Sequence, residues 1–514
     1  MITQSVKIHD RFQIELKFHY RLDDFQKTKA FDVALYFFVP ASLGINGDTY
    51  GKQDFFNDVM GYIRLKTPGV GLRGIATSPQ SPLHKLESAL ARLAHKPDGE
   101  AVGDYERQLK MTCCILKSAL RDHVALLASR VGPADQSDLV EQYLVHVTEV
   151  ARRFRALRSI INVPAVSKDL FSRYLFADEY LSLTVESYSF EMLEALKGLK
   201  SDLFEAYRPR LLGFVKSELE YRAASGYPSI PMESADNELL VFRKSVLKKY
   251  VESALFLTTR RKREGTYMEQ VVLAVAAGLS MVFATAAAFY SQVMYGNLTL
   301  PFFMALVVSY MFKDRIKDSL RAFLNMRVRR FFFDRRLEVF NDPEETERIG
   351  LSRESVDFVQ EGRLPASIWE LRNRDHITEI ENGSVGESIL LYRKQITLLP
   401  KWFSRMQKDF PVDGLNDILR VSFSEFLQRM DDPVKRLWIC QNADGYRSIE
   451  GKRVYHINLV VQYRTATSFG QGRYRIVLDK DGIKRIEPVR AERSMATVGL
   501  PESEDDFGPQ AISP

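Results

Sequence analysis

A glycine-rich loop near the N-terminus contains the residues whose types and spacing come nearest to a chemical site, namely Gly47, Gly51 and Lys52. The loop follows an apolar run, Phe31–Val39, and precedes a helical pattern. The order strand, loop, lysine and helix can hold a phosphate, because backbone N–H groups and an ammonium converge on it. Asn46 stands where a phosphate-binding loop has its first Gly, and Gln53 where it has a Mg²⁺-binding hydroxyl. These departures favour a plain surface loop over a nucleotide site.

The other motifs predict no catalytic or metal-binding residue. Gly69, Gly71 and Gly74 match the dinucleotide fingerprint by letters, but prolines stand on both sides, where the fingerprint needs a strand and a helix. The eight histidines and three cysteines form no His-Glu-x-x-His or Cys-x-x-Cys spacing, and no Gly-x-Ser-x-Gly motif occurs. We therefore expect no cofactor and no metal, and the sequence favours a protein without enzymatic activity.

The clearest signal is an uncharged stretch near the middle of the chain. Gln270 to Phe312 contains no Asp, Glu, Lys or Arg, although these residues make up 27% of the sequence. The first half, Gln270–Tyr290, has the length of about 20 apolar residues that crosses the hydrocarbon core of a bilayer. The second half, Leu298–Phe312, is shorter and reaches about 18 residues only when Gly296, Asn297 and the stem of Lys313 are included. Residues 266–313 therefore predict a two-helix transmembrane hairpin.

The residues expected inside the bilayer are apolar or small: Val271, Leu273, Gly278, Phe283, Ala288, Leu300, Phe303, Leu306 and Val308. Small residues recur four apart, first Ala274 and Gly278, then Ala284 and Ala288. This spacing lets two helix backbones approach closely. The partner is either the second span or another copy of the protein. Two buried core helices of a soluble protein are the alternative interpretation.

Basic residues flank the uncharged stretch: Arg260, Arg261, Lys262 and Arg263 before it, and Lys313, Arg315, Arg327, Arg329 and Arg330 after it. Basic flanks remain in the cytoplasm, so we expect both termini there and the uncharged loop outside. Residues 314–340 also carry an apolar stripe, which predicts a basic amphipathic helix in contact with anionic lipid headgroups. A nucleic-acid partner is not expected, because the net charge of the whole chain is only +6.

The parts outside the hairpin predict an α+β protein that is mostly helical. Residues 1–80 and 431–490 alternate between apolar and polar positions as strands do, and a turn is expected at Asp481–Gly482. Residues 81–265 and 341–430 show helical patterns, the second opened by the helix-start signature Asp342–Glu345. The tail, residues 491–514, has the acidic composition of disorder. We also expect strands from the two chain ends to join one sheet.

These features favour a membrane-tethered scaffold or regulatory protein of a bacterial-type inner (plasma) membrane complex. The expected partners are a bilayer with anionic headgroups and a second protein, or a second copy bound through the hairpin. A membrane-tethered enzyme with an unfamiliar site and a homo-oligomeric channel or transport component are the alternatives. The channel is less favoured, because no ionisable residue lies within the spans.

Overall fold

The computed structural model describes residues 2–21, 29–129, 132–199, 203–233, 236–264, 266–296, 299–328, 333–341, 347–373, 386–399, 402, 410–412, 414–442, 445–465 and 468–489. The chain divides into two compact units. The sheet unit comprises Met1–Ile63, Leu257–Arg405 and Gly414–Arg493. The helical unit comprises Arg64–Phe256, Met406–Asp413 and Ser494–Pro514. The predicted helix start at Asp342–Glu345 and the acidic tail lie outside the described residues.

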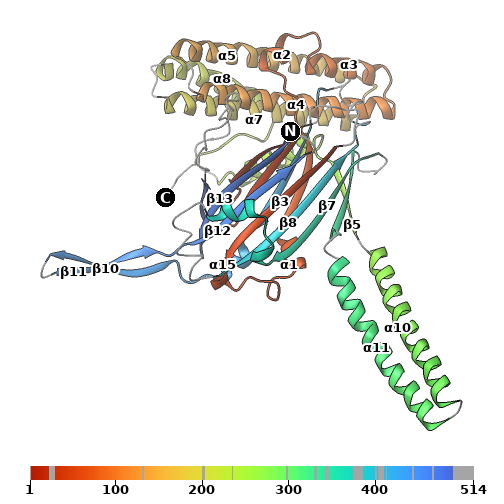
Figure 1. The fold of residues 1–514 in the computed structure, drawn as a ribbon. Coiled ribbons are helices and arrows are strands. Elements are labelled where there is room, and N and C mark those ends of the chain that lie inside the picture. Colours follow the sequence, from red (N-terminus) through yellow and green to blue (C-terminus); the bar gives the residue numbers. More distant parts are fainter. Residues whose placement is uncertain are drawn as a thin grey trace. The chain divides into compact units, whose positions relative to one another are not determined.

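The larger sheet of the sheet unit has eight antiparallel strands in the order β14-β13-β12-β3-β8-β7-β6-β5 (Figure 1). The strands are β14 (Gly482–Val489), β13 (Phe469–Asp479), β12 (Tyr455–Arg464), β3 (Lys29–Pro40), β8 (Glu387–Leu398), β7 (Arg348–Val359), β6 (Arg335–Phe340) and β5 (Thr258–Arg263). Near its centre β3 pairs with β12, which places Phe37 opposite Leu459. The prediction that strands from both chain ends share one sheet is therefore confirmed.

A smaller sheet of four strands, in the order β1-β2-β9-β4, faces the larger one. Its strands are β1 (Ile2–Ile8), β2 (Gln13–Arg21), β9 (Gly414–Ser422) and β4 (Val59–Leu65). The apolar positions of β2 are buried, as its alternation predicts: Ile14, Leu16, Phe18 and Tyr20. The ring of Tyr20 lies 4.9 Å from that of Phe31 on β3, so aromatic contacts join the two sheets.

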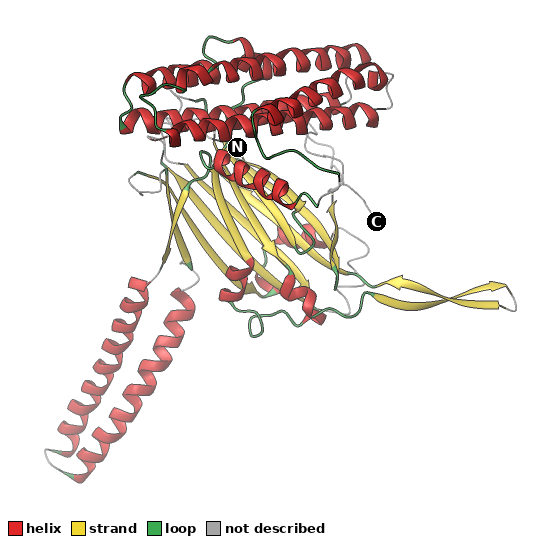
Figure 2. Ribbon diagram, turned by 180° about the vertical axis from the view of Figure 1, so that it is seen from behind, coloured by secondary structure: helices red, strands yellow, loops and turns green. Residues whose placement is uncertain are grey.

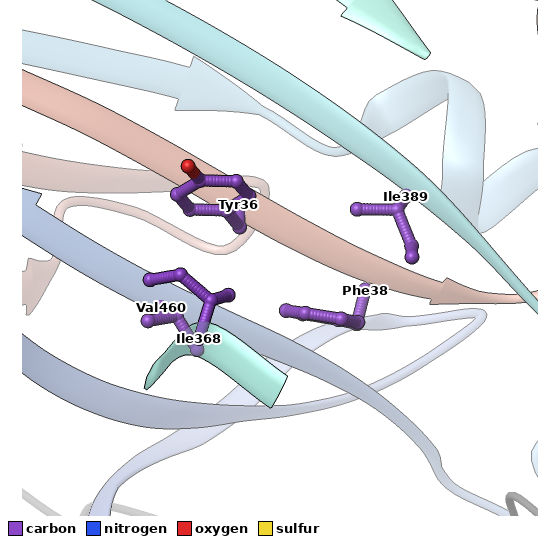
Figure 3. Packing of buried hydrophobic residues seen from close by; sticks show 5 residues of the cluster. All are labelled: Tyr36, Phe38, Ile368, Ile389 and Val460. Carbon is purple, nitrogen blue, oxygen red and sulfur yellow. The ribbon is translucent and has the colours of Figure 1, made fainter. Parts of the chain in front are cut away.

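Short helices complete the sheet unit: η1 (Ala41–Leu43), α1 (Lys52–Asp58), η2 (Glu361–Arg363), α12 (Ala366–Asn373) and α15 (Ser424–Gln428). On the face of the larger sheet opposite the smaller one, Ile368 of α12 packs against four buried side chains of the strands (Figure 3), namely Tyr36, Phe38, Ile389 and Val460. The larger sheet is thus buried on both faces at this point. This explains why the sequence of β3 is a nearly continuous run of apolar residues.

The helical unit is a bundle in which long helices run alongside one another (Figure 2). Its helices are α2 (Leu72–Thr77), α3 (Pro82–His95), α4 (Gly99–Ala128), α5 (Pro133–Ala156), α6 (Arg158–Ile161), α7 (Lys168–Gly198), α8 (Leu203–Ala224) and α9 (Glu238–Glu252). Ser81, Asp98 and Ser167 cap α3, α4 and α7 by accepting backbone N–H bonds. The helical pattern predicted for residues 81–265 is confirmed except for β5.

A buried polar cluster lies between α7 and α8 in the helical unit. The guanidinium of Arg222 is fully buried and bonds to Glu186, to Ser182 Oγ at 2.9 Å and to the Ser229 carbonyl at 3.2 Å. Glu186 and Ser182 are four residues apart and therefore lie on one face of α7. The charges are paired within the bundle, so this cluster fixes the alignment of two helices.

The helical pattern predicted for residues 341–430 is wrong where β7, β8 and β9 lie, and among the described residues only the short helices α12 and α15 and the 3-10 turn η2 agree with it. All three strands turn charged side chains inward, namely Glu354, Lys394 and Asp417. Charged residues at inward positions break the apolar alternation by which a strand is recognised. For the sheet unit, the sequence predicted correctly the α+β character and the strands at the two chain ends.

Lys394 is the centre of this inward-facing group. Its Nζ lies 2.8 Å from Asp417 Oδ1 in the smaller sheet and 3.3 Å from Glu354 Oε1 in its own. Burial disfavours the charged ammonium, yet the two carboxylates hold the pKa of Lys394 above its ordinary value. The hydroxyl of Tyr20 donates to Asp417 Oδ2 at 3.1 Å. One buried cation therefore joins the two sheets.

Replacing Lys394 with Met is expected to lower the free energy of unfolding by about 3–5 kcal/mol, because two carboxylates lose their buried counter-charge. Denaturant unfolding of the full chain in detergent, followed by circular dichroism, measures the change. Arg420→Met is the control, since Arg420 pairs with Glu15 at 3.0 Å near the surface. Its expected cost is about 0–1 kcal/mol. Equal costs for the two variants would contradict a special role for Lys394.

Candidate functional site

Two long helices, α10 (Thr266–Tyr295) and α11 (Leu300–Val328), form a hairpin that begins and ends at neighbouring strands of the larger sheet (Figure 1). The chain enters α10 directly from β5 and leaves α11 for β6, and these two strands pair in antiparallel register. Ser309 Oγ of α11 donates to the Ala284 carbonyl of α10 at 3.5 Å. Strand pairing therefore holds both ends of the hairpin together at its base.

The helices α10 and α11 are in contact, and α10 has buried residues four apart: Val272, Ala276 and Ser280. Of the two small pairs singled out in the sequence, Ala284 and Ala288 are half-buried, whereas Ala274 and Gly278 are exposed. A Cβ added to Gly278 would meet no atom within 4 Å. This pair is therefore not used between the two helices.

Most of the hairpin surface is apolar and exposed. The exposed fraction is 66% for Val282, 84% for Val293 and 75% for Leu300. None of the nine residues expected inside the bilayer is buried within the hairpin. Soluble proteins rarely expose apolar surface on this scale. Among the described helices one, over Gln270–Tyr295, is long and apolar enough to cross a membrane, and only 17% of its apolar window is buried.

The basic residues predicted to contact headgroups lie on different elements. Arg260, Arg261, Lys262 and Arg263 belong to β5, and Lys313 and Arg315 belong to α11. Arg327 is also on α11, but its side chain, like Arg329 and Arg330, falls outside the described residues. The helix predicted for residues 314–340 extends only to Val328, within α11, whereas Arg335–Phe340 is strand β6. Pairing with β5 and β7 overrides the helical pattern there.

The carboxylate of Glu338 on β6 binds cations from three adjacent strands. Lys262 Nζ of β5 lies 2.7 Å from it, Arg336 Nη2 of β6 3.1 Å, and Arg348 Nη1 of β7 3.7 Å. The hydrogen bond from Lys262 and the surrounding positive charge hold the pKa of Glu338 below its ordinary value of 4.5. Sequence reasoning missed this role, because the partners come together only through strand pairing. Glu338 therefore links the strands at the base of the hairpin.

The candidate phosphate loop is occupied by contacts within the protein. Lys52 Nζ lies 2.9 Å from Asp334 Oδ1 and 2.7 Å from Asp357 Oδ1. The N–H of Gly51 donates to Asp54 Oδ2 at 2.8 Å, and Gly47 lies beside the ring of Phe358. The ammonium of Lys52 is already balanced by two carboxylates, so the loop ties α1 to β7 and to the residue before β6.

Among the described residues, no three His, Cys, Asp or Glu side chains gather as metal ligands would. No family model, no curated protein and no solved structure matches the chain. The hairpin, its base and the charges around it are therefore the features on which a functional proposal depends.

Acidification is expected to loosen the base of the hairpin through Glu338. A carboxyl whose pKa is lowered on folding contributes stability that is present above pH 4.5, its unfolded value, and is lost as the pH falls through its folded value. Hydrogen exchange of the β5 and β6 amides, corrected for intrinsic rates, should rise below about pH 4.5. Glu338→Gln should raise exchange already at pH 7 and remove this pH dependence, whereas exposed Glu361→Gln should change neither. A pH response that persists in Glu338→Gln would assign it to another group.

Proposed function

We propose that this protein is a membrane-tethered scaffold or regulatory protein of an inner (plasma) membrane complex, with two spans and both termini in the cytoplasm. The observation that carries the proposal is the exposed apolar surface of α10 and α11, attached to the larger sheet by paired strands. Lipid is the environment in which such a surface is stable, because apolar side chains gain free energy on leaving water.

Two spans are proposed although α11 has fewer apolar residues than α10. Each Val, Leu or Phe near the centre of a span contributes about −0.3 to −0.6 kcal/mol to insertion. The apolar part of α11 ends at Phe312, where the Lys313 ammonium lies 4.1 Å from the centre of the Tyr310 ring. A lysine beside a tyrosine suits the bilayer interface, where the stem of the lysine lies in lipid and its charge in water. A single span would leave the apolar face of α11 in water.

The orientation follows from the distribution of charge. The residues that precede α10 and the second half of α11 are basic, whereas the loop between the helices carries no charge. Basic residues within about 15–20 positions of a span are retained in the cytoplasm. Both large parts of the chain therefore lie on the cytoplasmic side, where a scaffold would meet soluble partners.

A second feature supports the role of a scaffold: the strand pair β10 (Val434–Asn442) and β11 (Gly445–Lys452), which extends from the sheets as a ribbon (Figure 2). The rings of Trp438 and Tyr446 lie 5.5 Å apart, and the two residues are 60% and 77% exposed. An isolated two-stranded hairpin is marginally stable in water. Exposed Trp and Tyr are the side chains that contribute most to protein interfaces. We infer that this ribbon contacts a partner protein.

Gly278→Arg tests the membrane anchor. Arginine near the centre of a span is expected to cost about 2.5–3.5 kcal/mol and to reduce insertion. The measurement is the share of full-length protein that resists alkaline extraction from membranes. Ser245→Arg on α9, outside the hairpin, is the control and should leave this share unchanged. Unchanged extraction of Gly278→Arg, alone and combined with Ala276→Arg, would exclude the anchor.

The composition of the detergent-solubilised complex tests the scaffold. We expect a second protein in a fixed ratio, measured by light scattering and mass spectrometry, and its loss in Trp438→Ser/Tyr446→Ser. Membrane extraction of that variant should match the wild type, because the ribbon lies outside the hairpin. A symmetric assembly of this chain alone would favour the channel and contradict the scaffold.

A further inference from the structure

A hollow lies between the two sheets. It is lined in part by β5 and β6, the strands that flank the helical hairpin. It contains about 390 Å³ of atom-free space when open solvent is included, of which about 20 Å³ can hold the centre of a water molecule. The polar side chains that line it are Thr259 and Arg261 of β5, Arg335 of β6, Glu354 of β7 and Lys394 of β8. Apolar residues of β4 and α1, such as Ile63 and Phe56, form the opposite wall. The hollow thus belongs entirely to the sheet unit.

Strand register explains why two arginines meet here. In the β5–β6 pair, Arg261 is opposite Leu337, and Leu337 is two residues from Arg335 on the same face. The alternate residues of β5, Arg260 and Lys262, point to the other face, where Lys262 binds Glu338. Only the Arg261 face of β5 therefore opens into the hollow.

The charges that line the hollow are unbalanced. Lys394 is held by Asp417 and Glu354, and Glu354 is the one carboxylate in the lining. Among the described residues, neither Arg261 nor Arg335 forms an ion pair. Arg335 lies instead 3.7 Å from the centre of the Phe56 ring. Arg335 also lies opposite Glu354 in the β6–β7 pair, but Lys394 shares that carboxylate, so three cations face one carboxylate of the lining.

The two guanidinium groups also repel each other. Partial burial lowers the pKa of Arg335, and the positive charge of Arg261 lowers it further, although the carboxylates of Glu354 and Asp334 act in the opposite direction. An anion between them would remove the repulsion and accept hydrogen bonds from both guanidinium groups. The arrangement is thus more complementary to an occupied site than to an empty one.

We propose that this hollow binds one phosphate group, with Arg261 and Arg335 as its ligands. Arginine presents two parallel N–H donors that match two oxygens of a phosphate, and two arginines match its charge. The phosphate is supplied by a phospholipid headgroup or by a free phosphate ester. Headgroup supply rests on the proposed membrane anchor, since Arg261 precedes α10 by five residues. Binding of phosphate itself does not depend on that anchor.

Binding of inorganic phosphate to the delipidated full chain in detergent is the first test. Phosphate binding to the folded state raises the thermal unfolding midpoint in proportion to the logarithm of its concentration. We expect such a rise at constant ionic strength, and at least a tenfold loss of affinity in Arg261→Gln. Arg260→Gln is the matched control, because it removes the same charge from the opposite face of the same strand.

Lipid nanodiscs of two compositions distinguish the two sources of phosphate. Full-length protein in phosphatidylcholine nanodiscs is compared with nanodiscs that contain phosphatidic acid. A stabilisation by phosphatidic acid that Arg261→Gln abolishes and Arg260→Gln retains identifies the headgroup as ligand. Stabilisation by inorganic phosphate alone, with the same dependence on Arg261, identifies a free phosphate ester. Both results support a phosphate site.

Two results would overturn the proposal. The first is no stabilisation of the wild type by either probe. The second is equal losses in Arg260→Gln and Arg261→Gln, which would show general electrostatic attraction and no formed site. Arg261→Gln without ligand should unfold no earlier than the wild type, because it removes a repulsion. The membrane anchor is tested separately. If the anchor proposal is wrong, Gly278→Arg does not change alkaline extraction, and the phosphate test in detergent is unaffected.

Discussion

The antiparallel pairing of β5 with β6 is the constraint on which the arrangement of the hairpin depends. The chain must leave the sheet before a helical hairpin and rejoin it afterwards at a neighbouring position. Backbone hydrogen bonds between Thr258–Arg263 and Arg335–Phe340 hold these two points side by side. Glu338 reinforces it through cations on three strands. The same pairing sorts the side chains of β5, so that Lys262 binds Glu338 and Arg261 enters the hollow. The proposed membrane anchor and the proposed phosphate site thus depend on the same pair of strands.

The two sheets are held by charge as well as by apolar packing. Lys394 is almost completely buried, and its partners come from β7 in its own sheet and β9 in the other. Such a group contributes little net stability compared with apolar residues, but it is costly to break, so it fixes which residues face each other. Glu354 is the member of this group that also faces Arg335 across the strand pair β6–β7. Charged side chains are therefore neighbours from Arg335 at the base of the hairpin, through Glu354 and Lys394, to Asp417 in the smaller sheet.

The sequence predicted the parts of the fold that local patterns encode. The uncharged run of the hairpin, the alternation of β2 and the turn at Asp481–Gly482 each need only neighbouring residues for their recognition. The region from β7 to β9 was misread, because Glu354, Lys394 and Asp417 face inward and each is tolerated only through partners distant in the sequence. Glu338 was missed for the same reason, and Lys52 became a structural ion pair once Asp334 and Asp357 were brought beside it.

The amino-acid sequence was therefore sufficient to predict the helical hairpin and the strands at both ends of the chain. The hydrophobicity of contiguous residues is enough to predict these features. A long apolar run marks the hairpin, and alternation of apolar and polar residues marks a strand. The tertiary structure alone decided which charges are paired and which are not. Arg260 and Arg261 are adjacent and chemically identical, and only strand register directs Arg261 toward Arg335, because successive side chains of a strand point to opposite faces.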